Sequence, residues 1–145
     1  MIRRGAYALV WVLIGTALVG WATSHETPWV RLRLTPAMQG LSGHPLTIDV
    51  FVPHHPENRV LAVALDCDTY LRSWQEQLHG NDGQAEFLQS FDPMPEGRCT
   101  VDATVFRVTT ATKDGTTERV VVHRGVAGHV CFIGPNESCA SAVRR

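Results

Sequence analysis

The sequence contains little charge and almost no lysine, and these deficits exclude two classes of protein. Only 19% of its 145 residues are charged, the formal net charge is -1, and Lys113 is the single lysine. A nucleic-acid-binding domain would carry a basic surplus, and a disordered chain would have far fewer than the 44% hydrophobic residues found here. The composition therefore favours one small globular domain with no nucleic-acid partner.

Charge is absent altogether from one segment near the N-terminus. No Asp, Glu, Lys or Arg occurs between Gly5 and His25, and two arginines precede that segment. This pattern predicts one helix within residues 1–25, either a cleaved signal peptide or an uncleaved transmembrane anchor. In both cases the positive-inside bias exports residues 26–145 to the periplasmic or extracellular side of a cell envelope.

All four cysteines lie in the part of the chain that we expect to be exported, and none has the C-x2-C spacing of a zinc site. An even number of cysteines in an oxidising compartment is expected to form disulfides, and three pairings are possible. Sequence proximity favours a bond between Cys131 and Cys139, which leaves Cys67 to pair with Cys99. We expect neither a metal nor a cofactor at these positions.

Apolar residues that alternate with polar ones predict an all-β fold for most of the exported part. Asp114-Gly115, between the last two alternating segments, is a strong hairpin signal. In Tyr70–His79 the apolar residues instead recur at helical spacing, so we expect an irregular region or a brief helix that carries Trp74 into the core. Strands are expected at residues 30–34, 46–52, 60–66, 85–91, 99–108 and 118–123.

Six or seven short strands without a long helix between them favour an antiparallel β-sandwich of the immunoglobulin type. In such a sandwich the third and sixth strands, C and F, are antiparallel neighbours. Cys67 follows the strand expected at 60–66, and Cys99 begins the strand expected at 99–108. The pairing inferred from cysteine chemistry therefore agrees with the topology inferred from periodicity.

The stretch Ser90–Arg107 resembles a strand junction of bacterial immunoglobulin-like and fibronectin-type-III-like domains. Pro95–Gly97 supply the turn, and an alternating strand follows it. Cys99 stands where those families usually have tyrosine, so we expect a covalent bond in place of a tyrosine corner. The resemblance implies a β-sandwich over residues 30–124 and names no ligand.

Side chains capable of catalysis or metal binding are present, but they form no known motif. His54 and His55 are adjacent and point apart in an extended chain, and no serine lies in a G-x-S-x-G sequence. The aspartates that could bind calcium lack an ordered calcium loop; they are Asp66, Asp68 and Asp82. We therefore expect no enzyme activity, with a small exported enzyme or metal-dependent domain that uses these loop residues as the alternative.

The C-terminal segment after residue 123 is too apolar for a solvated tail and too rich in Gly and Pro for a helix. A Cys131–Cys139 bond would staple it to the domain. Either Phe132 and Ile133 pack on the sandwich and cover a sheet edge, or they stay partly exposed as a partner-binding anchor. The sequence thus favours a non-catalytic module, membrane-tethered or secreted, for binding or assembly of another envelope or extracellular protein, or of a glycan.

Overall fold

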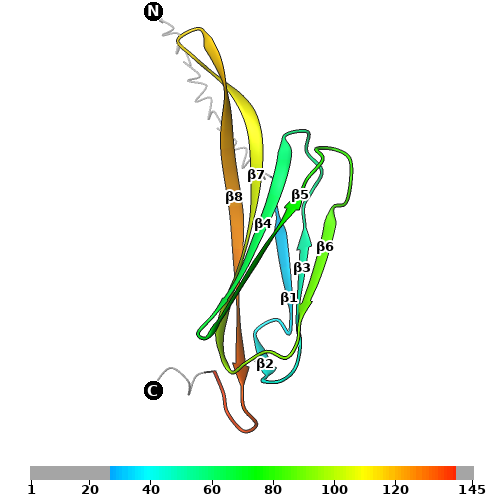
Figure 1. Ribbon diagram of the computed structural model, residues 1–145, viewed down its shortest axis with the longest axis vertical. Coiled ribbons are helices and arrows are strands. Elements are labelled where there is room, and N and C mark those ends of the chain that lie inside the picture. Colours follow the sequence, from blue (N-terminus) through cyan, green and yellow to red (C-terminus); the bar gives the residue numbers. More distant parts are fainter. Residues whose placement is uncertain (1–26, 140–145) are drawn as a thin grey trace, which may run out of the picture.

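The computed structural model describes residues 27–139, and the helix predicted within residues 1–25 lies outside this range. Within the described range the chain is all-β (Figure 1). No helix among these residues is long and apolar enough to cross a membrane. The strands are β1 (Arg31–Thr35), β2 (Gln39–Leu41), β3 (Leu46–Phe51), β4 (Asn58–Cys67), β5 (Tyr70–Gln77), β6 (Glu86–Phe91), β7 (Gly97–Lys113) and β8 (Thr116–Ile133).

The strands form two sheets whose buried faces share one hydrophobic core. The first sheet is antiparallel with the order β1-β3-β6, and the second has the order β2-β8-β7-β4-β5. All pairs in the second sheet are antiparallel except β2 with β8, which run parallel. The centre of the core is built from side chains of β3, β4 and β7, namely Leu46, Ile48, Val50, Leu61, Val63, Leu65, Val101, Ala103 and Val105.

Strand β3 shows how the alternating sequence produces this arrangement. Leu46, Ile48 and Val50 are completely buried, whereas the residues between them are only half-buried. Because successive side chains of a strand point to opposite faces, the alternation places Leu46, Ile48 and Val50 against the second sheet. Burial of each such aliphatic side chain contributes about 1.5 to 3 kcal/mol. The predicted strand at residues 46–52 is thus confirmed.

Both predicted disulfides are present. Cys67 of β4 lies directly opposite Cys99 of β7 with a Cα–Cα distance of 4.1 Å, so this bond joins neighbouring strands of one sheet. Cys131 bonds to Cys139 with a Cα–Cα distance of 6.1 Å. Two disulfides in a chain of this size are typical of an oxidising compartment.

The prediction for Tyr70–His79 is wrong, because residues 70–77 form strand β5. This strand pairs with β4 in continuous antiparallel register, and Trp74 lies opposite Val63. The helical spacing of the apolar residues is misleading here, since Leu71 points outward and is 65% exposed. Trp74 does pack against the core, as predicted, but it does so from an edge strand.

Strand β8 is much longer than the predicted strand at residues 118–123. It continues through Gly125 and Gly128 to Ile133, because β7 supplies a pairing partner for each residue as far as Phe132 and β2 pairs with Ile133. A side chain at Gly128 would lie 2.9 Å from a methyl group of Leu34, so this glycine lets β1 approach the strand closely. The hairpin predicted at Asp114-Gly115 is confirmed, and both turn residues have positive φ.

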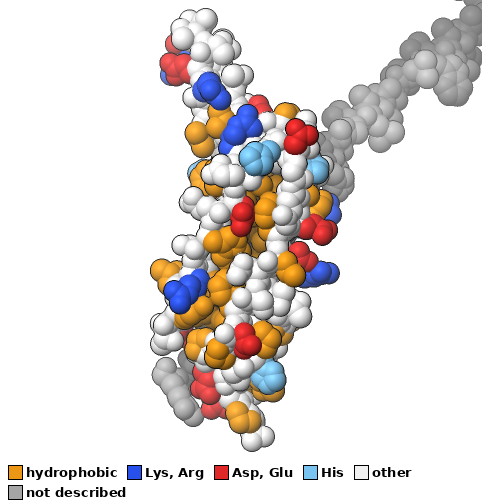
Figure 2. Space-filling view, turned by 45° about the vertical axis from the view of Figure 1, so that its right-hand side comes forward, with side chains coloured by type: hydrophobic (Ala, Val, Ile, Leu, Met, Phe, Trp, Pro, Cys, Tyr) orange, Lys and Arg blue, Asp and Glu red, His pale blue; other side chains and the backbone are white. Residues whose placement is uncertain are grey.

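One side of the molecule, between the edge strands β5 and β6, is closed by aromatic rings. Phe91 of β6 contacts Trp74 and Tyr70 of β5, with ring centroids 5.7 Å and 6.5 Å apart. Figure 2 turns this side forward and shows hydrophobic side chains in a line along it. The rings bridge the two sheets on this side, where no strand among the described residues passes from one sheet to the other.

Candidate functional site

The residues predicted as a partner-binding anchor are buried. Phe132 is 1% exposed and Ile133 is 4% exposed, at the end of β8 where β2 pairs with it. The prediction that they stay exposed at a loop tip is therefore wrong, because β8 continues through them and Gly40 of β2 covers the Phe132 ring. The alternative interpretation, that they pack on the domain and cover a sheet edge, agrees with the structure.

The outer face of the three-stranded sheet presents a surface that sequence reasoning did not identify. The register aligns Arg31 of β1, Phe51 of β3 and Glu86 of β6 in one row across the sheet. The next row contains Arg33, Asp49 and Leu88. We name these six residues, Arg31, Arg33, Asp49, Phe51, Glu86 and Leu88, the charged aromatic face.

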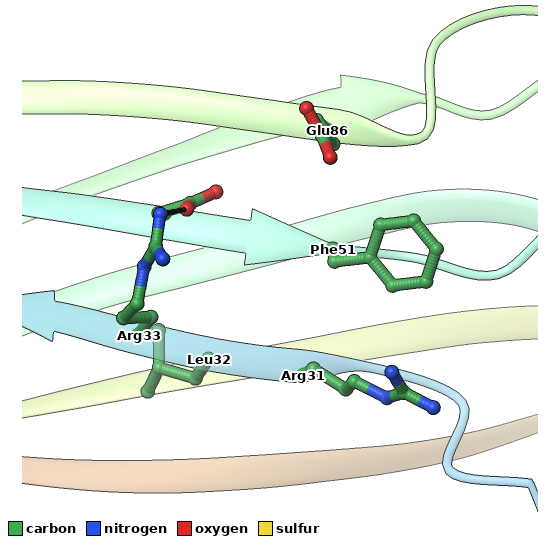
Figure 3. A pocket seen from close by; sticks show the side chains of 6 residues that line it. Arg31, Leu32, Arg33, Phe51 and Glu86 are labelled. Carbon is green, nitrogen blue, oxygen red and sulfur yellow. Dashed lines mark hydrogen bonds and ion pairs between the residues drawn. The ribbon is translucent and has the colours of Figure 1, made fainter.

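The charges of this face surround a partly exposed ring, as Figure 3 shows. The Arg31 guanidinium carbon lies 5.7 Å from the centroid of the Phe51 ring, within range of a cation–π interaction. Glu86 occupies the opposite side of that ring in the same row (Figure 3). Arg33 donates a hydrogen bond to Asp49 Oδ2 at 2.6 Å, an ion pair whose arginine side chain is 77% exposed. Two cations and two anions thus lie around an apolar centre, and one cation and one anion are joined as an ion pair.

The face is also hollowed on both sides of Phe51 and Glu86. A shallow depression of about 380 Å³ extends from them over β1 to Arg31 and Arg33. A second, of about 550 Å³, extends in the other direction to Leu88, whose side chain is 70% exposed. Aromatic rings and arginines are enriched in protein interfaces, and exposed apolar side chains rimmed by polar ones mark interaction sites.

A separate hollow of about 500 Å³ lies beside the C-terminal disulfide. Met38, which is 80% exposed, forms part of its wall. Thr100 Oγ1 and His129 Nδ1 are 3.1 Å apart there and share a hydrogen bond. The other residues that line this hollow are Arg98, Cys99, Val130, Cys131 and Cys139.

Three of the histidines and aspartates considered for catalysis or metal binding contact backbone groups. His54 Nε2 lies 3.1 Å from the carbonyl oxygen of Gly83, and His55 Nδ1 accepts a hydrogen bond from the Glu57 backbone. Asp68 accepts a hydrogen bond from the backbone N–H of Arg98. Within residues 27–139, no three His, Cys, Asp or Glu side chains come together in a group that could hold a metal ion.

The sequence analysis also did not predict a buried polar cluster at the end of the core. Arg107 Nε donates a hydrogen bond to Asn58 Oδ1 at 2.8 Å, and Asn58 Nδ2 donates to the Pro53 carbonyl at 2.9 Å. The Arg107 guanidinium stacks 3.8 Å from the Trp29 ring centroid. Burial lowers the pKa of Arg107, and the nearby Glu57 carboxylate partly opposes this effect. The signal in the sequence was an arginine at an inward-facing position of an alternating strand.

Comparisons of the chain with protein-family models, with curated proteins and with solved structures gave no significant match.

Proposed function

We propose that this chain is a non-catalytic binding module of the immunoglobulin-like β-sandwich class. The order β8-β7-β4-β5 corresponds to the G-F-C-C′ order of a variable-type sheet, and β1-β3-β6 corresponds to strands A, B and E. One departure is the Cys67–Cys99 bond, which lies within a sheet, whereas the antibody disulfide joins the two sheets.

The proposed location is the periplasmic or extracellular side of a cell envelope, with the chain either secreted or held by its N-terminal segment. The two disulfides support an oxidising compartment. Maleimide labelling in intact cells tests this proposal, because all four thiols would resist labelling until a reductant is added. Labelling without a reductant would place the chain in a reducing compartment.

The partner is proposed to be a protein that docks on the charged aromatic face. The observation that carries this proposal is the Phe51 ring held between Arg31 and Glu86, beside the exposed Leu88. A protein surface offers an apolar side chain to the Phe51 ring and charges of both signs to the arginines and carboxylates around it. A glycan would also stack on Phe51, but it gains nothing from the exposed leucine.

Site-specific photocrosslinking in the native cell tests this docking surface. A photoreactive residue at position 88 should yield one discrete adduct, and Phe51→Ala should reduce that adduct strongly. The matched control is position 71, because Leu71 is 65% exposed but lies on β5 of the other sheet. The same adducts at positions 71 and 88, or an adduct that does not respond to Phe51→Ala, would refute the proposal.

A further inference from the structure

The hairpin of β7 and β8 projects beyond the rest of the molecule (Figure 1). β4 pairs with β7 only as far as Arg107, whereas β7 and β8 continue together to Lys113 and Thr116. Almost every residue of the projecting part is exposed. The hairpin therefore extends as a two-stranded ribbon with little core beneath it.

One edge of this ribbon is a long strand edge without a partner strand among the described residues. β2 covers β8 only at Cys131–Ile133, and no described strand pairs with Thr116–His123 on the side away from β7. The sequence of that edge includes three consecutive valines, and the central one, Val121, is 65% exposed. An unpaired edge rich in β-branched residues is a template for pairing with another strand.

The sequence around Val121 is complementary to itself when it is read in the antiparallel direction. With Val121 opposite Val121 of a second copy, Val120 lies opposite Val122, and Glu118 lies opposite Arg124. Each of these two unlike pairs occurs twice because of the two-fold symmetry. Arg124 also stacks over Trp29, with its guanidinium carbon 4.9 Å from the ring centroid.

Neighbouring registers lack this complementarity. In an antiparallel pair, two residues directly opposite each other have their side chains on the same face of the sheet. A two-fold axis perpendicular to the sheet keeps each residue on its own face, so the axis must pass between the two copies of one residue. Centring on Glu118 or Arg119 places like charges opposite each other, and such pairs are destabilising. Centring on Val120 or Val122 places Glu118 opposite a valine. The register centred on Val121 therefore pairs the valines with one another and Glu118 with Arg124, and it places Arg119 opposite His123.

We propose that the free edge of β8 binds β8 of a second copy of this chain, antiparallel and centred on Val121. The two five-stranded sheets then join into one continuous sheet across the two-fold axis. This inference is independent of the charged aromatic face, which lies on the other sheet and stays accessible in such a dimer.

Oxidative crosslinking of the full chain in its native membrane or medium tests the register. In Val121→Cys the two introduced thiols would face each other across the axis, within reach of a disulfide. The matched control is Thr116→Cys, also exposed on β8, whose two copies would be about 34 Å apart at 3.4 Å per residue. We expect a reducible product of twice the chain mass from Val121→Cys and only background from Thr116→Cys.

A second pair of variants tests the dimer without introduced thiols. Val121→Lys places two ammonium groups opposite each other, whereas Val121→Thr keeps a β-branched side chain. Because Val121 is exposed, neither substitution removes core packing. We expect native electrophoresis to show loss of the dimer for Val121→Lys and its retention for Val121→Thr. Equal crosslinking at positions 116 and 121, no product from Val121→Cys, or a product of any other mass would overturn the proposal.

Discussion

Replacing Phe132 by alanine distinguishes a structural role for the end of β8 from a binding role. Phe132 is the largest fully buried side chain among the described residues. A Cβ atom built on Gly40 would lie 2.8 Å from its ring, so the ring packs directly on the backbone of β2. The substitution would therefore leave a cavity between β2 and the core.

The expected cost follows from the size of the removed ring. Phenylalanine-to-alanine changes in protein cores lower the free energy of unfolding by about 3 to 5 kcal/mol. Small domains have a net stability of about 5 to 15 kcal/mol, so this loss is a large fraction of the total. With a urea m-value of about 1.5 kcal/mol/M, the unfolding midpoint should fall by about 2 M or more.

Urea unfolding followed by tryptophan fluorescence, with both disulfides intact, measures this change. Leu88→Ala is the matched control, because Leu88 is 70% exposed and its loss should change stability by no more than about 0.5 kcal/mol. If Phe132→Ala lowered stability by less than about 1 kcal/mol, the argument from burial would be refuted. The interpretation of Phe132 as an exposed anchor would then have to be reconsidered.

Three further predictions concern stability and are measured by the same urea titration. Replacing Cys67 and Cys99 together by alanine should lower the free energy of unfolding by about 3 to 4 kcal/mol, because the unfolded chain is no longer closed into a loop with sequence separation 32. An unchanged urea midpoint would contradict this prediction. Asn58→Ala and Arg107→Ala should each lower the free energy of unfolding by about 1 to 3 kcal/mol, and the double variant should lower it by less than the sum of the two. Strict additivity would show that the hydrogen bond between the two side chains contributes nothing. Gly40→Ala should cost about 1 to 3 kcal/mol through overcrowding against the phenylalanine ring, and a neutral result would mean that β2 can move away.

The sequence alone determined where most strands lie and which cysteines pair. In β3 the side chains alternate regularly because one face is buried and the other faces outward, and this local pattern survives in any arrangement of the neighbours. The Asp114-Gly115 turn was equally predictable, because few residues accept positive φ at two successive positions. The pairing of Cys67 with Cys99 was expected from the even number of cysteines and the proximity of Cys131 to Cys139, and it agreed with the expected order of the strands.

Local patterns failed where pairing between distant segments decided the conformation. Tyr70–Gln77 has apolar residues at helical spacing, but β4 offers it a complete strand edge, and the hydrogen bonds along that edge override the spacing. The glycine-rich end of β8 is extended for the same reason, since β7 pairs with it as far as Phe132.

The candidate surfaces were decided by tertiary structure for a related physical reason. Arg31, Phe51 and Glu86 are far apart in the sequence, and only the register of three strands places them in one row. The sequence left open whether Phe132 packs on the domain or stays exposed beside the Gly-Pro turn, and the parallel pairing of β2 with β8 buries it. Alternation in a sequence shows which residues share a face of their own strand, whereas the neighbour across that face depends on non-local hydrogen bonds that the pattern does not encode.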